Sequence, residues 1–154
     1  GSDALKFRFQ ANKYGPYSHN LTKLLDSLDG SYLRCDKRLA DADPLDLIWF
    51  NDAKYDRVQA YLNSGEGKQF SSVLEWASAT IDGFESPLGM ELLATVDWMM
   101  QHDDIEPTVE GVMEGLKDWA GGEVAGQRKL KIFDRRLVAI ALGQLQTSNR
   151  LPAC

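Results

Sequence analysis

Residues 86–101 read SPLGMELLATVDWMMQ, and their apolar side chains recur every three or four residues. This spacing places them on one broad face of a helix, as expected for a helix that packs into a core. Ser86 and Pro87 favour a helix start, because serine caps helix N-termini and proline fits the first turn. The sequence therefore predicts a central core helix ending near Gln101, with an inward stripe of Leu88, Leu92, Thr95, Val96, Met99 and Met100.

The N-terminal part predicts a strand, a turn and a short helix. Residues 5–10 alternate between apolar and polar side chains, which is typical of a strand with one buried face. The Gly-Pro pair at 15–16 indicates a turn. Ser18 or Asn20 can cap the helix that follows, and the Asp-Gly pair at 29–30 ends it.

Two further β-like segments follow, at residues 31–35 and 45–50, joined by the polar stretch 36–44. We expect them to form a small antiparallel element with the first strand. From residue 52 the pattern is helical as far as 81, with a break at the Gly-Glu-Gly sequence of 65–67.

Two more helices are predicted in the C-terminal part, the first from Pro107-Thr108 to the glycine pair at 121–122. The last spans about residues 126–146, and most of the four tryptophans are expected in the core. In this last helix we expect Ile132, Phe133, Leu137, Ile140, Ala141 and Leu145 to face inward and Arg128, Lys129, Lys131, Arg135 and Arg136 to face mostly outward.

The predicted fold class is α+β, a mainly helical single domain with a small antiparallel sheet near the N-terminus. We assign residues 3–146 to this domain and residues 147–154 to a C-terminal tail. The 154 residues are 44% hydrophobic and 26% charged, as in an ordinary globular domain. No run of 18 apolar residues and no signal peptide is visible, so we expect a cytoplasmic protein that does not bind a membrane.

Catalytic groups are scarce in the sequence. The two histidines, His19 and His102, are not in the setting of a nucleophile elbow, and with two cysteines they cannot complete a structural zinc site. No glycine-rich stretch matches a phosphate-binding loop. A pair of carboxylates distant along the chain stays open as an acid/base pair. We therefore expect no catalytic residue, no cofactor and no metal, and a protein that is not an enzyme.

Charge is distributed unevenly along the chain. Residues 1–60 contain nine Lys/Arg and nine Asp/Glu, residues 61–125 contain two against thirteen, and residues 126–154 contain six against one. The acidic middle has two interpretations: solvated helix faces, or a surface for a basic partner. Direct binding of nucleic acid would depend on the basic last helix, which lacks interleaved aromatic residues, so we do not expect it.

Several segments resemble the C-terminal domain of DarG antitoxins. They are FRFQANKYGPYS at 7–18, LDGSYL at 28–33, CDKRLADA at 35–42, and IDGFESP and MELLATVDW at 81–87 and 90–98. The resemblance covers most of residues 5–146. It implies a protein partner, DarT, a toxin that uses NAD to ADP-ribosylate thymidine in single-stranded DNA. It also implies a macrodomain in the full-length chain, which removes the modification and is absent from these 154 residues.

The resemblance suggests a function for the acidic residues of 61–125. A toxin that holds single-stranded DNA needs a basic groove, which carboxylates can occupy in place of phosphates. We therefore expect an antitoxin domain that occludes this groove, with blockade of the NAD pocket as the competing mechanism and a non-inhibitory module that tethers the macrodomain to the toxin as the alternative function. Loops are where binding residues concentrate. The candidate contacts are Tyr14, Tyr17, Asp36, Asp41, Asp43, Asp82 and Glu85.

Overall fold

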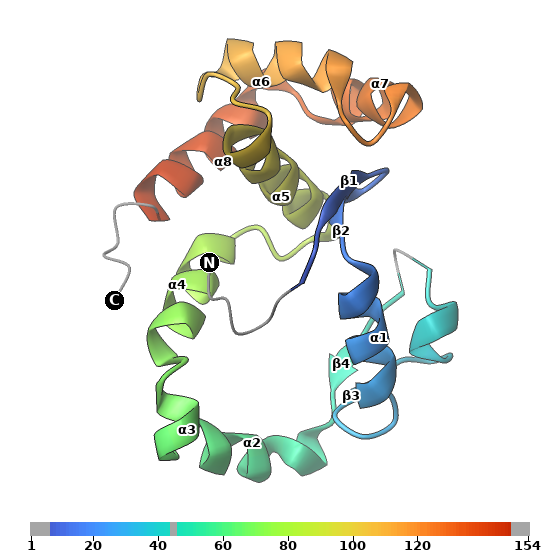
Figure 1. Ribbon diagram of the computed structural model, residues 1–154, viewed down its shortest axis with the longest axis vertical. Coiled ribbons are helices and arrows are strands. Elements are labelled where there is room, and N and C mark those ends of the chain that lie inside the picture. The colour runs from blue at the N-terminus through green and yellow to red at the C-terminus, as the bar shows by residue number, and fades with distance from the viewer. Residues whose placement is uncertain (1–6, 44–45, 149–154) are drawn as a thin grey trace. The chain divides into compact units, whose positions relative to one another are not determined.

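A computed structural model (Figure 1) describes residues 7–43 and 46–148. The chain forms two compact units, which are discontinuous in sequence. Of the described residues, unit 1 contains 7–8, 18–43 and 46–75, and unit 2 contains 9–17 and 76–148. Residues 9–17 therefore fold with the C-terminal half of the chain and not with their sequence neighbours.

Unit 1 begins with helix α1 (His19–Leu28), which starts directly after Ser18 as predicted. Strands β3 (Leu33–Arg34) and β4 (Trp49–Phe50) then pair in antiparallel fashion. The polar connection between them contains a single turn of 3-10 helix, η2 (Leu39–Asp41), whose first backbone N–H donates to Asp29 Oδ2 at 3.0 Å. The β3–β4 pairing confirms two of the predicted strands, but within the described residues they do not pair with the first strand.

The rest of unit 1 is helical, with η3 (Asp52–Lys54), α2 (Tyr55–Leu62), α3 (Gly65–Lys68) and the start of α4 (Ser71–Ile81). The break expected at residues 65–67 is wrong, because these residues form α3. The Ser64 side chain caps this helix by accepting from Gly67 N at 3.2 Å. Gly67 is required there, since a Cβ at this position would clash with the backbone carbonyl of Tyr61.

Unit 2 contains the β-hairpin of strands β1 (Gln10–Asn12) and β2 (Gly15–Tyr17). The strand predicted at 5–10 is therefore wrong in its position. Its residues 5 and 6 lie outside the described residues, and residues 7–9 have no regular structure. The hairpin is fixed to the unit by Trp119, whose Nε1 donates to the Asn12 carbonyl at 3.0 Å, and by Gly121, where a Cβ would clash with the same carbonyl.

The core of unit 2 lies among helices α5 (Pro87–His102), α6 (Val109–Gly115), α7 (Glu123–Ile132) and α8 (Arg135–Ser148), with the short η4 (Leu116–Asp118) between α6 and α7. The predicted core helix is confirmed as α5, and Ser86 caps it by accepting from Gly89 N at 3.0 Å. Leu88 is the exception in its stripe, because it is exposed. The side chains with no exposed surface include Val96, Met99, Val112, Leu116, Phe133, Val138 and Ala141.

The last helix is interrupted, which corrects the prediction of one helix over 126–146. Phe133 leaves the helical conformation at the end of α7, and the Asp134 side chain starts α8 by accepting from the backbone N–H of Leu137 at 2.8 Å. The change of direction alters which residues face inward. Phe133 is fully buried as expected, but Ile140 is 50% exposed and Lys129 is fully buried. Helix α8 continues through Ser148, and residues 149–154 lie outside the described residues.

The predicted fold class is confirmed, because the chain is mainly helical with a small antiparallel sheet near the N-terminus. The expectation that most tryptophans lie in the core is wrong: Trp119 is buried and Trp98 partly buried, but Trp49 and Trp76 are exposed. No helix within residues 7–43 and 46–148 is long and apolar enough to cross a bilayer.

Candidate partner-binding surfaces

A long run of exposed charge, mostly of one sign, lies in unit 2 at residues 103–123. This stretch, which we call the acidic segment, contains seven carboxylates against one lysine, Lys117. Glu110 and Glu114 lie one turn apart on α6, where side chains four residues apart are neighbours on the surface. Glu110 pairs with Arg135, and Glu114 pairs with Lys117 at 2.5 Å. All seven are exposed: Asp103, Asp104, Glu106, Glu110, Glu114, Asp118 and Glu123.

Three of the predicted contact residues lie in the β3–β4 connection of unit 1. Asp36, Asp41 and Asp43 are all exposed. Asp43 is already paired, because Lys37 Nζ lies 2.8 Å from its Oδ2 and 2.8 Å from Asp46 Oδ2. The hydrogen bonds to Asp43 and Asp46 raise the pKa of Lys37 above its ordinary value. Asp43 is therefore a weaker candidate for a charged contact than its two neighbours.

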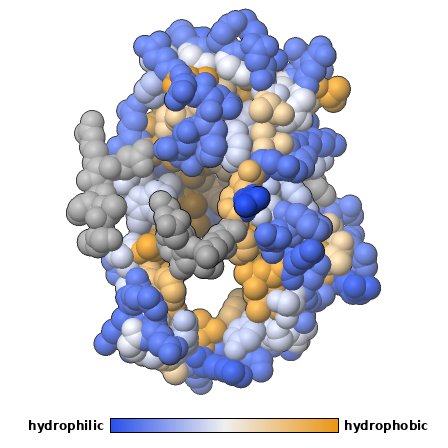
Figure 2. Space-filling model, in the orientation of Figure 1, coloured by the Kyte–Doolittle hydropathy of each residue, from blue (hydrophilic) through white to orange (hydrophobic). Residues whose placement is uncertain are grey.

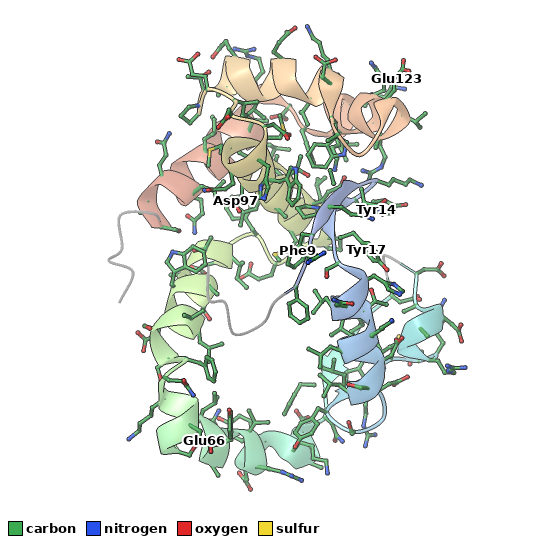
Figure 3. All side chains as sticks on the ribbon, in the orientation of Figure 1. Phe9, Tyr14, Tyr17, Glu66, Asp97 and Glu123 are labelled. Atoms are coloured by element: carbon green, nitrogen blue, oxygen red, sulfur yellow. The ribbon has the colours of Figure 1, made fainter. Side chains whose placement is uncertain are left out.

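The other four predicted contacts lie in unit 2. Asp82 and Glu85 are exposed in the turn between α4 and α5. Tyr14 lies in the hairpin turn and Tyr17 at the end of β2, with 44% and 38% of their surfaces exposed (Figure 3). The seven candidates are thus divided between the two units.

Tyr14 is held by cations. The guanidinium of Arg128 lies 5.0 Å from the centre of its ring, and Lys13 Nζ lies 4.9 Å from it. These distances are within the range of cation–π interaction. Arg128 in turn donates to Glu91 Oε1 at 2.5 Å, so the hairpin turn is connected to α5 through α7.

A buried ion pair continues this network, and the sequence prediction missed it. Lys129 Nζ donates to Glu91 Oε1 at 2.7 Å and to Thr95 Oγ1 at 3.1 Å, with no part of the lysine side chain exposed. Lys129 also faces the rings of Trp119 and Phe133. A signal was available in the sequence, because Lys129 lies four residues before Phe133 on the same helical face, as a core residue would.

The ionisation of this pair depends on their mutual hydrogen bonds. Burial alone would raise the pKa of Glu91, but the hydrogen bonds from Arg128 and Lys129 outweigh it, and the pKa lies below its ordinary value. Burial also lowers the pKa of Lys129, against the opposing hydrogen bond from Glu91. The geometry is that of a structural cluster, because the side chains of both Glu91 and Lys129 are buried.

Asp97 on α5 is the other carboxylate in an unusual setting (Figure 3). It is half-buried, and burial raises its pKa, while the nearby His102 and a hydrogen bond with Gln101 lower it. His102 stacks on Trp98, with 3.8 Å between the ring centres. A buried carboxyl with a raised pKa destabilises the folded state at neutral pH, where it must be ionised.

We expect Asp97→Asn to increase the free energy of unfolding at pH 7. The raised pKa means that the wild-type folded state is penalised above this pKa and that the penalty disappears as pH falls below the ordinary aspartate value. The increase in the free energy of unfolding caused by Asp97→Asn should therefore be present at pH 7 and absent near pH 3. Urea denaturation at both pH values measures it. Asp118→Asn, at an exposed position, is the control, and equal effects of the two variants at pH 7 would contradict the prediction.

No group of three or more His, Cys, Asp or Glu side chains in the described part of the chain is placed to hold a metal ion. The surface has a shallow depression of about 520 Å³ along α7. Its lining is mixed in charge, with Glu123 beside Arg128 and Lys131. It is open to solvent, whereas small-molecule sites usually enclose most of the surface of their ligand.

Three curated proteins are similar to the chain over almost its whole length. A DNA ADP-ribosyl glycohydrolase of Thermus aquaticus is 27% identical over 144 residues, which is 94% of this chain and 34% of that protein. Proteins of the same name from Mycobacterium bovis and Mycobacterium tuberculosis are each 26% identical over 146 residues, 92% of this chain and 39% of theirs. The chain thus spans between a third and two fifths of the length of these relatives. It matches no model of a known protein family.

These relatives agree with the resemblance to DarG in its broad terms, since their name concerns ADP-ribose on DNA. They contradict the expectation that the protein is not an enzyme. All three are named for an enzyme activity, and the similarity covers more than nine tenths of this chain. The sequence-based expectation rested on the scarcity of histidines and nucleophiles. A chain with few such groups can still be part of an enzyme.

Proposed function

We propose that this chain binds and neutralises a DarT-type toxin by covering the groove in which the toxin holds single-stranded DNA. The chain acts within a protein related to the DNA ADP-ribosyl glycohydrolases, and the removal of ADP-ribose from DNA is proposed for that protein as a whole. The observation that carries this proposal is the acidic segment, where seven exposed carboxylates face solvent against one lysine.

The physical argument is one of charge. A groove that binds single-stranded DNA is lined with cations that follow the phosphates. An acidic surface is attracted to it over a range of about 8–10 Å at physiological salt, and like charges exclude the DNA once the groove is occupied. The pairing of Glu110 with Arg135 reduces the local charge but leaves an acidic excess in the segment.

Inhibition of the toxin's DNA modification by the 154-residue chain tests the proposal, at fixed toxin concentration with increasing single-stranded DNA. We expect inhibition that is overcome as DNA rises. Inhibition that is independent of DNA would assign the contact to another surface, such as the NAD pocket. Binding without inhibition would favour the alternative function, a module that tethers the glycohydrolase to the toxin.

The acidic segment should govern how fast the complex forms. We expect the triple variant Glu110→Gln, Glu114→Gln and Asp118→Asn to lower the association rate constant about fivefold to tenfold at low salt, because steering by charge acts mainly on association. The difference should shrink above 0.5 M salt. Stopped-flow or surface plasmon resonance measurements give the rates.

A matched triple variant separates the acidic segment from the net charge. Asp26→Asn, Glu66→Gln and Glu75→Gln remove the same charge from exposed positions of unit 1. If this control lowers the association rate as much as the first triple variant does, the acidic segment has no special role.

A further inference from the structure

Cations of unit 2 lie together where the β1–β2 hairpin approaches α7. Residues 9–17 and 124–133 contain four cations and no carboxylate. Tyr14 connects the two segments, because the Arg128 guanidinium lies 5.0 Å from the centre of its ring. Three of the four cations reach the surface, and together with Tyr14 they form what we call the hairpin–α7 surface: Lys13, Tyr14, Arg128 and Lys131.

Glu91 does not balance the positive charge of this surface. It is the one carboxylate that pairs with Arg128 and Lys129 among the described residues, and it accepts from both through the same oxygen, Oε1. Lys13 and Lys131 form no ion pair within the part of the chain that the structure describes. Four cations therefore lie here against one buried carboxylate, and this excess favours the binding of an anion.

The shape of this region suits a strand that crosses it. Arg128 and Lys131 line the shallow depression along α7, and Val124 and Ile132 supply apolar parts of its lining. Because the depression is open to solvent, it can hold part of a long ligand whose ends extend beyond it. Protein surfaces that bind DNA are more polar than those that bind protein, and Figure 2 shows a mostly hydrophilic surface over α6 and α7.

Exposed aromatic rings accompany the cations. On the hairpin, Phe9, Tyr14 and Tyr17 are 45%, 44% and 38% exposed (Figure 3). Surfaces that bind single-stranded nucleic acid combine cations for the phosphates with aromatic rings on which bases stack. The expectation that this chain does not bind nucleic acid directly rested on the lack of aromatic residues within the basic last helix. The structure places the ring of Tyr14, from a distant part of the chain, against Arg128.

We propose that the hairpin–α7 surface binds single-stranded DNA, with its three cations on phosphates and Tyr14 against a base. The inference goes beyond the neutralisation of the toxin. It rests on the proposed function in one respect, because a protein that removes ADP-ribose from DNA must hold that DNA, and single strands are the form that the proposed toxin modifies. The acidic segment, which includes Glu123 in the lining of the depression, repels phosphates and so limits the length of strand that binds.

Titration of a short fluorescein-labelled oligothymidine with the 154-residue chain, followed by fluorescence anisotropy, tests the inference. A plot of the logarithm of the association constant against the logarithm of the salt concentration should have a slope of about −2, as expected for three cations on the phosphates of a single strand. Lys13→Gln with Lys131→Gln should weaken binding about tenfold at low salt and reduce the slope to about −0.7. Tyr14→Ala should also weaken binding about tenfold, because it removes a ring on which a base stacks.

Matched variants make the outcome specific. Lys23→Gln with Lys68→Gln removes the same charge from exposed positions of unit 1 and should change the affinity less than twofold. Tyr14→Phe should retain most of the affinity, because a phenyl ring still stacks on a base. Glu123→Gln should strengthen binding, since it removes a carboxylate from the lining of the depression. Unfolding midpoints of all variants are measured in parallel, and if Tyr14→Ala proves unstable the two pairs of lysine variants decide.

The result separates this inference from the proposed function, because the titration contains no toxin. If the wild-type chain does not bind the oligonucleotide at low salt, or if the Lys13 and Lys131 variant binds it equally well, the inference alone is overturned. The same variant should inhibit the toxin as well as the wild-type chain does. If it loses the toxin and retains the oligonucleotide, the hairpin–α7 surface is a protein contact, which also overturns the inference. A wild-type chain that binds the oligonucleotide through this surface but does not bind the toxin would support the inference while the proposed neutralisation fails.

Discussion

Glu91→Ala should lower the free energy of unfolding by about 3–5 kcal/mol, the usual cost of removing one partner from a buried ion pair. Glu91 is the carboxylate that compensates the fully buried ammonium of Lys129, and it also holds Arg128. Without it, Lys129 retains the Thr95 hydroxyl as its remaining hydrogen-bond acceptor in the described structure. Urea denaturation followed by circular dichroism measures the loss at pH 7.

Glu114→Ala is the matched control. Glu114 forms an ion pair of similar length with Lys117, but both side chains are more than half exposed, and exposed pairs contribute about 0–1 kcal/mol. The pH dependence gives a second check. Since the pKa of Glu91 is lowered in the folded state, its contribution is present above the ordinary glutamate pKa of 4.5 and is lost as pH falls below it. Equal losses for the two variants would contradict the buried network.

Phe133→Ala should lower the free energy of unfolding by about 3–5 kcal/mol, as substitutions of other fully buried phenylalanines do. Phe133 lies at the interruption between α7 and α8 and has no exposed surface. Its ring also faces the Lys129 ammonium at 5.4 Å, so the substitution removes a cation–π contact as well as apolar packing. Thermal or urea unfolding measures the effect.

Ile140→Ala distinguishes the observed fold from the predicted one. One continuous helix over 126–146 would bury Ile140 as well as Phe133, and both substitutions would then be costly. In the structure Ile140 is half exposed, so its replacement should cost less than about 1 kcal/mol. A loss of 3 kcal/mol or more at Ile140 would support the continuous helix.

The sequence predicted the elements whose signals are local. Helix α5 could be predicted because a long apolar stripe follows a Ser-Pro start, and α1 because leucines at helical spacing end at an Asp-Gly pair. Strands β3 and β4 fall within the β-like segments predicted at residues 31–35 and 45–50, although the structure shortens each to two residues. The first strand was misplaced because alternation over residues 5–10 does not reveal that the pairing begins at Gln10.

The features that the sequence did not predict depend on contacts between residues that are distant along the chain. Lys129 was expected to face solvent because it is a cation, and its burial follows from Glu91, thirty-eight residues earlier in the chain. The apolar residues 47–49 were interpreted as a strand, and no local pattern shows that they remain exposed. Of the predicted contacts, the exposure of Asp36, Asp41, Asp82 and Glu85 suits partner binding, but their role stays a prediction.

The discontinuity of unit 2 has a consequence for the order of folding during synthesis. The β1–β2 hairpin is synthesised before the rest of unit 2, and the groups that fix it, Trp119 and Gly121, are more than a hundred residues further along the chain. The hairpin therefore lacks these partners until residues 119–121 have been synthesised. Residues 18–75 of unit 1, which lie between the two parts in sequence, are synthesised before Trp119 and Gly121 and set the length of the loop that must close. A shorter or better-folded unit 1 would speed this closure, so the rate at which unit 2 matures is controlled by residues that lie outside it.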